Sequence, residues 1–295
     1  MRHRHLGFTD SCVLRRNQFV ILGLLLFVAI VSASSLLGAA CVFEPIETHN
    51  SSHFVGDSPK LIINNEHGFI RINKGPDNEI AVQVELQGSG DIDCEVIQDG
   101  DTIILNTETN RRWGPFGTCQ VDVTINTPYK TDIELETSDG LIEIDGIECS
   151  GPLKTSNGDI ILRNVKGDID AETRDGDIGI HTLEGNMRLR NVNGELNLQE
   201  VTGEIDAATS NGEIKASIYM MPNGTNQLIT SNETVHVRLL GTPNVKLDAS
   251  TTAASVSSSL PIVAETTQDD YLVGVIGDGS ASLLIRTTNS DIIIE

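Results

Sequence analysis

Aromatic side chains are scarce in this sequence. They make up 4% of its 295 residues, with a single tryptophan, whereas glycine occurs 27 times. A thick core normally uses many aromatic rings, which bury more area than any other side chain. The composition therefore favours thin, repeated layers of Ile, Leu and Val over one large core.

Basic side chains are also scarce. The chain has 20 lysines and arginines against 42 aspartates and glutamates, and its formal net charge is −22. A surface of this sign repels the phosphates of nucleic acids and anionic lipid headgroups. We therefore expect no nucleic-acid partner.

Sequence motifs of the common enzyme classes are missing. The chain has no G-x-S-x-G, no nucleotide-binding G-x-x-x-x-G-K-[ST] and no C-x-x-C. A serine hydrolase, a phosphate-binding loop and a zinc or thiol redox centre therefore have no support. We predict a protein that is not an enzyme, with no catalytic residues and no obligatory cofactor.

An apolar run near the N-terminus predicts a targeting segment. Four arginines lie within residues 1–18, and Phe19–Ala40 carries no charge. An uncharged segment of this length can cross the hydrocarbon core as a helix, and the preceding arginines predict that the bulk of the chain lies outside. Small residues before Cys41 loosely match a lipoprotein signal, which would lipidate Cys41.

Residues 1–41 are thus a lipoprotein signal, an uncleaved signal anchor or a cleaved signal peptide. All three place the rest of the chain outside the cytoplasm. The first two anchor it to the cell membrane through lipid or a transmembrane span.

Five cysteines limit the possible cross-links. Cys12 lies in the targeting region, and export permits disulfides among the remainder. Cys94 and Cys119 both begin extended apolar runs and are the favoured disulfide pair. A bond between Cys119 and Cys149, or free buried thiols, are the alternatives.

Two regions precede the regular part of the chain. Residues 42–59 are polar and contain two prolines, which predicts a tether. Residues 60–130 hold apolar runs of period two, such as Ile80–Leu86, and Asp99-Gly100 predicts a hairpin turn between two of these runs. They are predicted to form an irregular, β-rich beginning of the main domain.

An internal repeat of 18 residues fills residues 131–220. Positions +2, +4 and +7 after one set of glycines are apolar in every copy, the last +7 residue being Tyr219. After a second set, midway between the first, the +7 position is mostly polar. The halves of nine therefore differ, and the true period is 18. The first set is Gly140, Gly158, Gly176, Gly194 and Gly212, and the second is Gly167, Gly185 and Gly203.

This period predicts an all-β fold, a parallel β-solenoid of the β-helix or β-roll type, preceded by the N-terminal signal or anchor segment. Positions +2 and +4 share one face of a strand, and the +7 residue points inward only if the chain turns after +4. Each coil then contributes two short strands, and coils stack about 4.8 Å apart with residue i over residue i+18. Asn or Asp before the first-set glycines predicts corners in which glycine supplies a positive φ.

The phase of the repeat loosens after Tyr219. Residues 221–295 are predicted to form degenerate repeats and a C-terminal cap. In that cap, a last strand at Ile292–Ile294 would cover the open end of the solenoid, where backbone groups are otherwise unpaired.

Recurring short segments give the chain a family resemblance. Thr-Ser-Asn-Gly-Asp-Ile at 155–160, Thr-Ser-Asn-Gly-Glu-Ile at 209–214, Ser-Ser-Ser-Leu-Pro at 257–261 and Gly-Asp-Gly at 277–279 resemble the bacterial β-strand repeat family labelled "putative adhesin", a domain of unknown function. The resemblance covers residues 60–295. It implies a β-solenoid on a bacterial or archaeal cell envelope, and no catalytic residues.

An acidic ladder is the first candidate site. Asp159, Asp177, Glu195 and Glu213 follow first-set glycines, so stacking places their carboxylates about 5 Å apart. Ca²⁺ between the rungs would relieve the repulsion, as cations do in nonapeptide-repeat rolls. The simpler interpretation, a solvated acidic face, is favoured because the Gly-Gly-x-Gly-x-Asp pattern of those rolls is missing.

The second candidate site is a break in the repeat at 109–118. Arg111, Arg112, Trp113 and Phe116 bring rare aromatic and basic groups together there, and an exposed Trp beside Arg can stack on a sugar or anchor a partner. The favoured alternative is that Trp113 and Phe116 plug the open N-terminal end of the core.

The sequence as a whole predicts a non-enzymatic cell-envelope protein. It would use a rigid solenoid for binding, adhesion or envelope sensing, with an envelope protein or glycan as partner. A carbohydrate-active enzyme on a β-helix scaffold, with paired carboxylates, is one alternative. A self-assembling structural solenoid is another.

Overall fold

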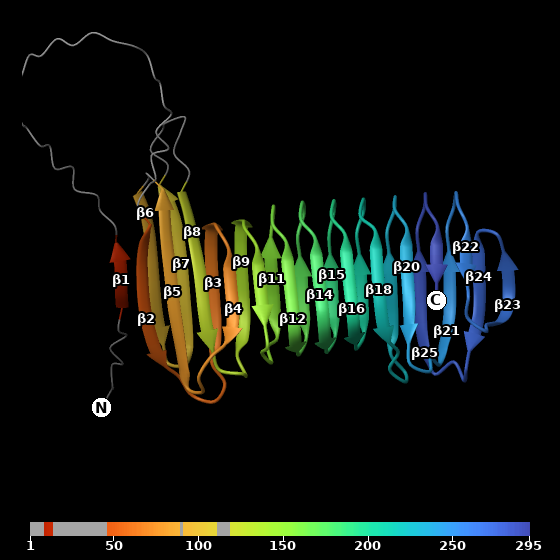
Figure 1. The fold of residues 1–295 in the computed structure, drawn as a ribbon, viewed down its shortest axis with the longest axis horizontal. Helices are drawn as coiled ribbons and strands as arrows, with labels where there is room; N and C mark the ends of the chain where they lie inside the picture. Colours follow the sequence, from red (N-terminus) through yellow and green to blue (C-terminus); the bar gives the residue numbers. More distant parts are fainter. Residues whose placement is uncertain (1–8, 14–45, 89–90, 111–118) are drawn as a thin grey trace, which may run out of the picture.

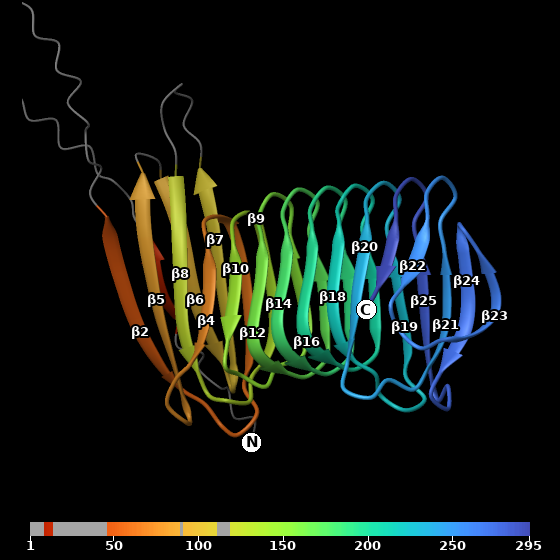
Figure 2. The ribbon, with the colours of Figure 1, turned by 45° about the vertical axis from the view of Figure 1, so that its right-hand side comes forward.

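The computed structural model describes residues 9–13, 46–88, 91–110 and 119–295. These residues form 26 strands and no helix. The strands build two long sheets, one of 14 strands, named sheet A, and one of 12 strands, named sheet B. Figures 1 and 2 show the strands stacked side by side along one long axis, with the two sheets facing each other. The protein is therefore all-β, with mostly parallel strands, as predicted for a solenoid.

The N-terminal strands are β1 (Thr9–Val13), β2 (Glu47–Phe54), β3 (Lys60–His67), β4 (Ile70–Lys74), β5 (Glu79–Gly88), β6 (Asp91–Asp99), β7 (Thr102–Asn110) and β8 (Cys119–Thr127). The central strands are β9 (Asp132–Asp139), β10 (Ile142–Asp145), β11 (Gly151–Thr155), β12 (Ile160–Lys166), β13 (Ile169–Glu172), β14 (Ile178–Glu184), β15 (Met187–Arg190), β16 (Leu196–Thr202), β17 (Ile205–Ala208) and β18 (Ile214–Tyr219). The C-terminal strands are β19 (Thr225–Ile229), β20 (Val235–Leu240), β21 (Val245–Ser250), β22 (Val256–Ser258), β23 (Val263–Gln268), β24 (Tyr271–Ile276), β25 (Ala281–Arg286) and β26 (Ile292–Ile294).

The predicted stacking of residue i on residue i+18 is confirmed. In sheet B, Ile142 pairs with Ile160, Ile160 with Ile178, and Ile178 with Leu196, all in parallel register. These residues are fully buried. Identical apolar side chains stacked rung over rung therefore form the dry core between the two sheets.

The chain turns inward after position +4, as the pattern required. Gly146, Asn164, Thr182 and Glu200, each at +6, have left-handed backbones with φ of 76°, 53°, 63° and 54°. This turn directs the +7 side chain into the core, where Leu183 is 1% exposed.

Tyr219 corrects the prediction for the last copy of the repeat. It was expected in the core, but its side chain is 44% exposed, and Ile218 occupies the buried position. The pairing of β16 with β18 shifts register between Leu198 and Val201. The last copy of the repeat is therefore one residue shorter than the others. The apolar pattern concealed this deletion, because Ile218 and Tyr219 are adjacent and both apolar.

The first-set glycines are required for a different reason than predicted. They do not have positive φ, which belongs instead to the second-set glycines, such as Gly185 at 153°. A Cβ on Gly176 would lie 2.0 Å from the carbonyl oxygen of Gly158, and a Cβ on Gly158 would lie 1.9 Å from that of Gly140. Close contact between successive backbones, and not torsion angle, excludes a side chain there.

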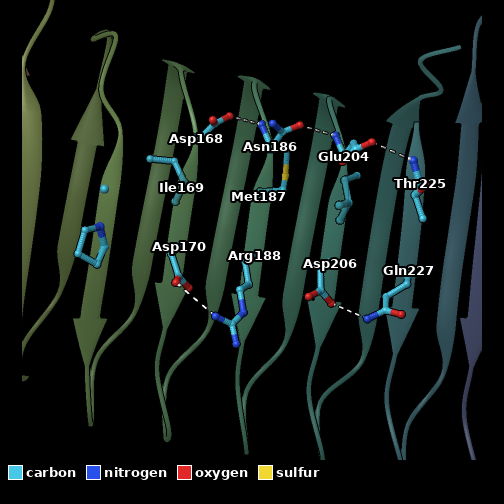
Figure 3. Close-up of a pocket in the computed structure, with 13 residues that line it drawn as sticks. Asp168, Ile169, Asp170, Asn186, Met187, Arg188, Glu204, Asp206, Thr225 and Gln227 are labelled. Atoms are coloured by element: carbon cyan, nitrogen blue, oxygen red, sulfur yellow. Dashed lines mark hydrogen bonds and ion pairs between the residues drawn. The ribbon is translucent and has the colours of Figure 1, made fainter. Parts of the chain in front are cut away.

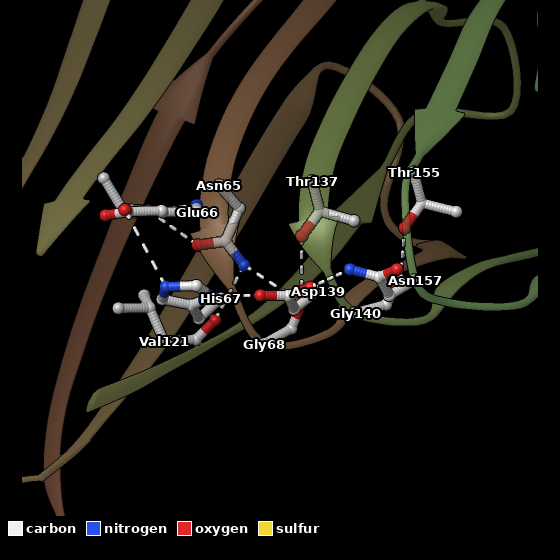
Figure 4. A network of polar contacts seen from close by, with 11 residues as sticks. Asn65, Glu66, His67, Gly68, Val121, Thr137, Asp139, Gly140, Thr155 and Asn157 are labelled. Carbon is white, nitrogen blue, oxygen red and sulfur yellow. Dashed lines mark hydrogen bonds and ion pairs between the residues drawn. The ribbon is translucent and has the colours of Figure 1, made fainter. Parts of the chain in front are cut away.

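A buried polar ladder lines the same corner. Thr155 Oγ1 donates to the carbonyl oxygen of Gly140 at 3.1 Å, and Thr173 Oγ1 to that of Gly158 at 2.9 Å. Asn191 takes the same place in the next coil and donates to Gly176. Figure 4 shows the start of this ladder, with Thr137 and Thr155 above Gly68 and Gly140. Thr or Asn recurs three residues before each first-set glycine and thus satisfies carbonyl groups that would otherwise be buried without a partner.

Antiparallel strands occur at both ends of sheet A and at the N-terminal end of sheet B, whereas sheet B ends at its other side with the parallel strand β22. In sheet A, β24 pairs antiparallel with β21, and β23 with β24. At the other end, β6 pairs antiparallel with β7 through a turn at Gly100, which confirms the predicted Asp99-Gly100 hairpin. In sheet B, β5 pairs antiparallel with β8.

The last strand of the chain does not cap the solenoid, which corrects the prediction for Ile292–Ile294. β26 lies inside sheet B between β20 and β22, and β25 lies inside sheet A between β19 and β21. Figures 1 and 2 show this final coil in dark blue within the stack. The β23–β24 hairpin closes that end instead, and no local signal in the sequence specifies such an insertion.

The prediction of a tether at 42–59 is wrong for Glu47–Phe54. These residues form β2, which pairs with β5 along its whole length. Its polar side chains concealed the strand, since it lies at the edge of sheet B and is mostly exposed. Within the predicted targeting segment, β1 pairs with β6, which requires both strands to lie on one side of any membrane. The apolar span and Cys41 lie outside the described residues, among which no helix is long and apolar enough to cross a membrane.

Candidate functional site

A groove on the outer face of sheet A is the candidate functional site. It has a volume of about 760 Å³ and crosses β11, β13, β15, β17 and β19. Its lining residues are Gly151, Pro152, Asp168, Ile169, Asp170, Asn186, Met187, Arg188, Glu204, Ile205, Asp206, Thr225 and Gln227. The groove therefore follows the long axis of the molecule across successive coils.

Two rows of polar side chains form the walls of the groove, as Figure 3 shows. The corner row stands at the start of the strands, either directly before the first residue or, at β19, on it, and consists of Asp168, Asn186, Glu204 and Thr225. The strand row stands two residues further along each strand and consists of Asp170, Arg188, Asp206 and Gln227. Two residues of a strand span about 7 Å, which sets the separation of the rows.

The floor of the groove is backbone. Ile169, Met187 and Ile205 lie between the two rows, but their side chains point into the core and are at most 2% exposed. Alternation along the strand thus turns the polar groups outward and leaves a narrow channel between them.

The corner row is fixed by hydrogen bonds from the main chain. Asp168 Oδ1 accepts the amide of Asn186 at 2.8 Å, and Asn186 Oδ1 accepts the amide of Glu204 at 3.1 Å. Glu204 Oε1 accepts the amide of Thr225 at 3.4 Å. Each bond uses one side-chain oxygen, so both carboxylates keep a second oxygen outside this ladder.

The strand row is fixed by contacts between side chains. Arg188 lies 3.7 Å from Asp170, and Gln227 donates to Asp206 at 2.7 Å. Burial alone would raise the pKa of Asp206, but hydrogen bonds from Arg190 and Gln227 outweigh it and lower that pKa. Asp206 therefore stays ionised in the groove at neutral pH.

The groove carries a negative charge. Four carboxylates and one guanidinium line it, and the acids occur in pairs, Asp168 with Asp170 and Glu204 with Asp206. The sequence contains the signal for both rows, as polar residues one and three places after each second-set glycine. Only the acids after the first-set glycines were predicted as a site, so this groove was not predicted.

The predicted calcium ladder has a structural role at the opposite corner. Asp159 Oδ1 accepts the amide of Asp177, and Asp177 Oδ1 accepts the amide of Glu195, both at 2.8 Å. Glu195 and Glu213 contact Lys215 at 3.3 and 2.8 Å. Within the described ranges, no group of three or more His, Cys, Asp or Glu side chains is placed to hold a metal ion.

The other predicted site residues divide into two groups. Arg111, Arg112, Trp113 and Phe116 lie outside the described residues, as does the lipidation candidate Cys41. Cys94 and Cys119 lie on opposite sheets, in β6 and β8.

The Cys119 thiol is free, so no bond joins it to Cys94 in the structure, and that disulfide stays a prediction for the exported protein. Cys149, the alternative partner, is also a free thiol. Burial, with a smaller contribution from Asp132, raises the pKa of Cys149 to about 12.

Comparison with known proteins assigns residues 58–295 to a protein family. The Toastrack DUF4097 family, a family of unknown function, matches residues 58–295. No protein of curated function matches the chain in sequence.

Several solved structures are similar to it over most of its length. A "putative adhesin" of Bacteroides fragilis NCTC 9343 is 9% identical, covers 84% of this chain and 97% of its own, and has a TM-score of 0.44. A "putative adhesin" of Parabacteroides merdae ATCC 43184 is 11% identical, covers 84% and 96%, and has a TM-score of 0.38. A "putative cell adhesion protein" of Clostridium sporogenes ATCC 15579 is 12% identical, covers 84% and 99%, and has a TM-score of 0.27.

Proposed function

This chain belongs to the Toastrack DUF4097 family, and on that premise we propose that it is a non-enzymatic binding module held outside the cell membrane. The observation that carries the proposal is the groove on sheet A, whose two polar rows are fixed by contacts along the stack. A site whose side chains are already ordered loses little entropy when a ligand binds.

The proposed location is supported by the N-terminal sequence. The family match begins at residue 58 and leaves the arginines and the apolar run of residues 1–41 outside the domain. A lipid on Cys41 would anchor the module on the extracytoplasmic side once residues 1–40, which include β1, are cleaved off. An uncleaved span at Phe19–Ala40 would anchor it there too, but it requires β1 to separate from β6.

Two observations favour binding over catalysis. The groove carboxylates Asp168 and Glu204 each already accept a main-chain amide, so one oxygen of each is held by the framework of the stack. The pKa of Asp206 is lowered, whereas a glycosidase needs one carboxyl group with a raised pKa to act as general acid.

The antiparallel edge of sheet A at β23 also favours a binding module over a self-assembling solenoid. β23, at one end of sheet A, has a register irregularity between Ala264 and Thr266. Bulges of this kind twist an edge strand away from a further partner.

The test is retention of envelope components by the immobilised full chain in detergent. The groove variant Asp170→Asn with Asp206→Asn removes two charges from the strand row. The matched variant Glu136→Gln with Glu172→Gln removes two charges from exposed positions on the same sheet, outside the groove.

We expect saturable retention of an unmodified component by the wild type and the matched variant, and weaker retention by the groove variant. Equal retention by all three, or release of product from an envelope polysaccharide, would contradict the proposal.

A further inference from the structure

The charges in the groove recur every second coil. Asp168 precedes β13 and Asp170 lies within it. Glu204 and Asp206 take the same two places at β17, two coils further on. Between them, the coil of β15 contributes Asn186 and Arg188. Because coils stack about 4.8 Å apart, the two acidic pairs lie about 9.6 Å apart along the groove.

The groove admits an extended chain and no wider structure. Its rows are separated by about 7 Å, whereas a helix with its side chains is about 10–12 Å across. All wall residues are exposed or half-exposed, so the outer face of sheet A is open along this channel.

We propose that the groove binds a cationic polypeptide segment in the polyproline II conformation, with a basic residue at every third position. This conformation has three residues per turn and rises about 3.1 Å per residue, so every third side chain recurs on one face after about 9.3 Å. That repeat matches the spacing of the two acidic pairs. This inference rests on the proposed binding function and names the class of its ligand.

Other extended spacings fit the groove less well. In a β-strand, neighbouring side chains on one face are about 6.7 Å apart, and the next pair is about 13 Å apart. The first spacing puts a cation near Arg188, and the second overshoots the second acidic pair.

Arg188 enforces this spacing. Its guanidinium lies 3.7 Å from Asp170, and its side chain is 61% exposed. A cation over the coil of β15 would meet a like charge, whereas cations over the coils of β13 and β17 meet carboxylates. In the β17 pair Asp206 already pairs with Arg190, so Glu204, which uses only Oε1 in the corner row, offers the freer oxygen. The middle coil therefore selects against continuous runs of basic residues.

The test uses peptides of proline with five lysines placed at every second, third or fourth position, and fluorescence anisotropy at 0.15 M salt with the full chain in detergent. We expect the every-third peptide to bind about fivefold tighter than the other two, as a few partly exposed ion pairs allow. The groove variant Asp170→Asn with Asp206→Asn should lose about tenfold in affinity, and the matched variant Glu136→Gln with Glu172→Gln should bind as the wild type does.

A second variant guards against a loss caused by misfolding. Arg188→Gln removes the like charge from the middle coil and should tighten all three peptides while reducing the preference for every-third spacing. Equal binding of the three peptides by the wild type, or unchanged affinity in the groove variant, would overturn the inference.

The two proposals fail in different ways. If the groove variant loses the envelope component but no peptide spacing is preferred, the binding function stands and the ligand class is wrong. If neither the component nor any peptide depends on the groove, the binding function assigned to it is wrong as well.

Discussion

At the residue scale, the backbone contact between successive coils constrains the corners most. Gly176 packs so closely on Gly158 that a Cβ would lie 2.0 Å from its carbonyl oxygen. Backbone cannot withdraw as a flexible side chain can, so the coils must separate to admit a methyl group.

We expect Gly176→Ala to lower the free energy of unfolding by about 3 kcal/mol, the upper range for overpacking a rigid site. Gly179→Ala is the matched control, because a Cβ there has no neighbour within 4 Å and its φ is not positive. That change should be neutral or stabilising by about 0.5 kcal/mol. Urea denaturation measures both, and equal effects would refute the contact argument.

Cys149 provides a second prediction at this scale. Burial raises the pKa of its thiol to about 12, so almost no thiolate exists at neutral pH. Cys119 is only half-buried. In the reduced protein, a thiol reagent should modify Cys119 within minutes and Cys149 only on unfolding, as mass spectrometry of labelled peptides would show. Rapid labelling of Cys149 would contradict its burial.

At the scale of elements, one carboxylate joins the first coil of the chain to the repeat. Glu143 on β10 binds Arg71 on β4 at 2.8 Å and also Arg163 on β12. The hydrogen bond from Arg71 is the largest cause of the lowered pKa of Glu143, with burial opposing it and Arg163 adding to it.

The lowered pKa of Glu143 determines how the stabilisation from these two ion pairs depends on pH. Its stabilisation is complete above the ordinary carboxyl pKa of 4.5 and is lost as pH falls through the lowered value. Glu143→Gln should cost about 1 kcal/mol at pH 7. The difference from the wild type should shrink steadily below pH 4.5 in melts of both proteins. A constant difference down to pH 2 would show that the ion pairs contribute nothing.

The final coil yields a prediction about whole elements. β25 and β26 are each paired on both sides, and Ile285, Ile292 and Ile294 are fully buried. Deleting residues 281–295 should therefore expose the coils on either side and unfold residues 241–280. We expect a lower denaturation midpoint, a smaller m-value and rapid proteolysis in that segment. A truncated chain with unchanged m-value would mean that the neighbouring coils close the gap.

At the scale of the whole molecule, charge opposes the compact state. The chain has a net charge of −22, and most ion pairs of its elongated stack are at least partly exposed. Raising the salt from 0.01 to 0.1 M shortens the screening length from about 30 to about 10 Å. The melting temperature should rise with NaCl, because self-repulsion falls.

Calcium gives a control for this effect. Asp159 and Asp177 use their carboxylates to accept main-chain amides, so CaCl₂ and MgCl₂ of equal ionic strength should raise the melting temperature equally. A larger rise in melting temperature with CaCl₂ than with MgCl₂ would show that the acidic ladder binds calcium.

The sequence determined the repeat, and the repeat determined most of the stack. Spacings of 18 at Gly158 and Gly176, with Ile160 and Ile178 two places on, specify strand, turn and register together, because identical residues must superpose to fill a core between two sheets. The corner and strand rows of the groove recur with the same period and were predictable in principle. Only the fold shows that Asp168 and Asp170 face one channel, since their side of the sheet depends on where the chain turns.

The tertiary structure alone decided where the ends of the chain lie. β26 inserts between β20 and β22, and β3 stacks on β9, because parallel strands pair through backbone groups that any segment can offer. Such long-range pairing leaves no periodic trace in the amino-acid sequence, whereas stacking of neighbours does. The periodic sequence therefore specifies the regular coils. The order in which the terminal strands join them depends on the burial of apolar residues in the whole stack.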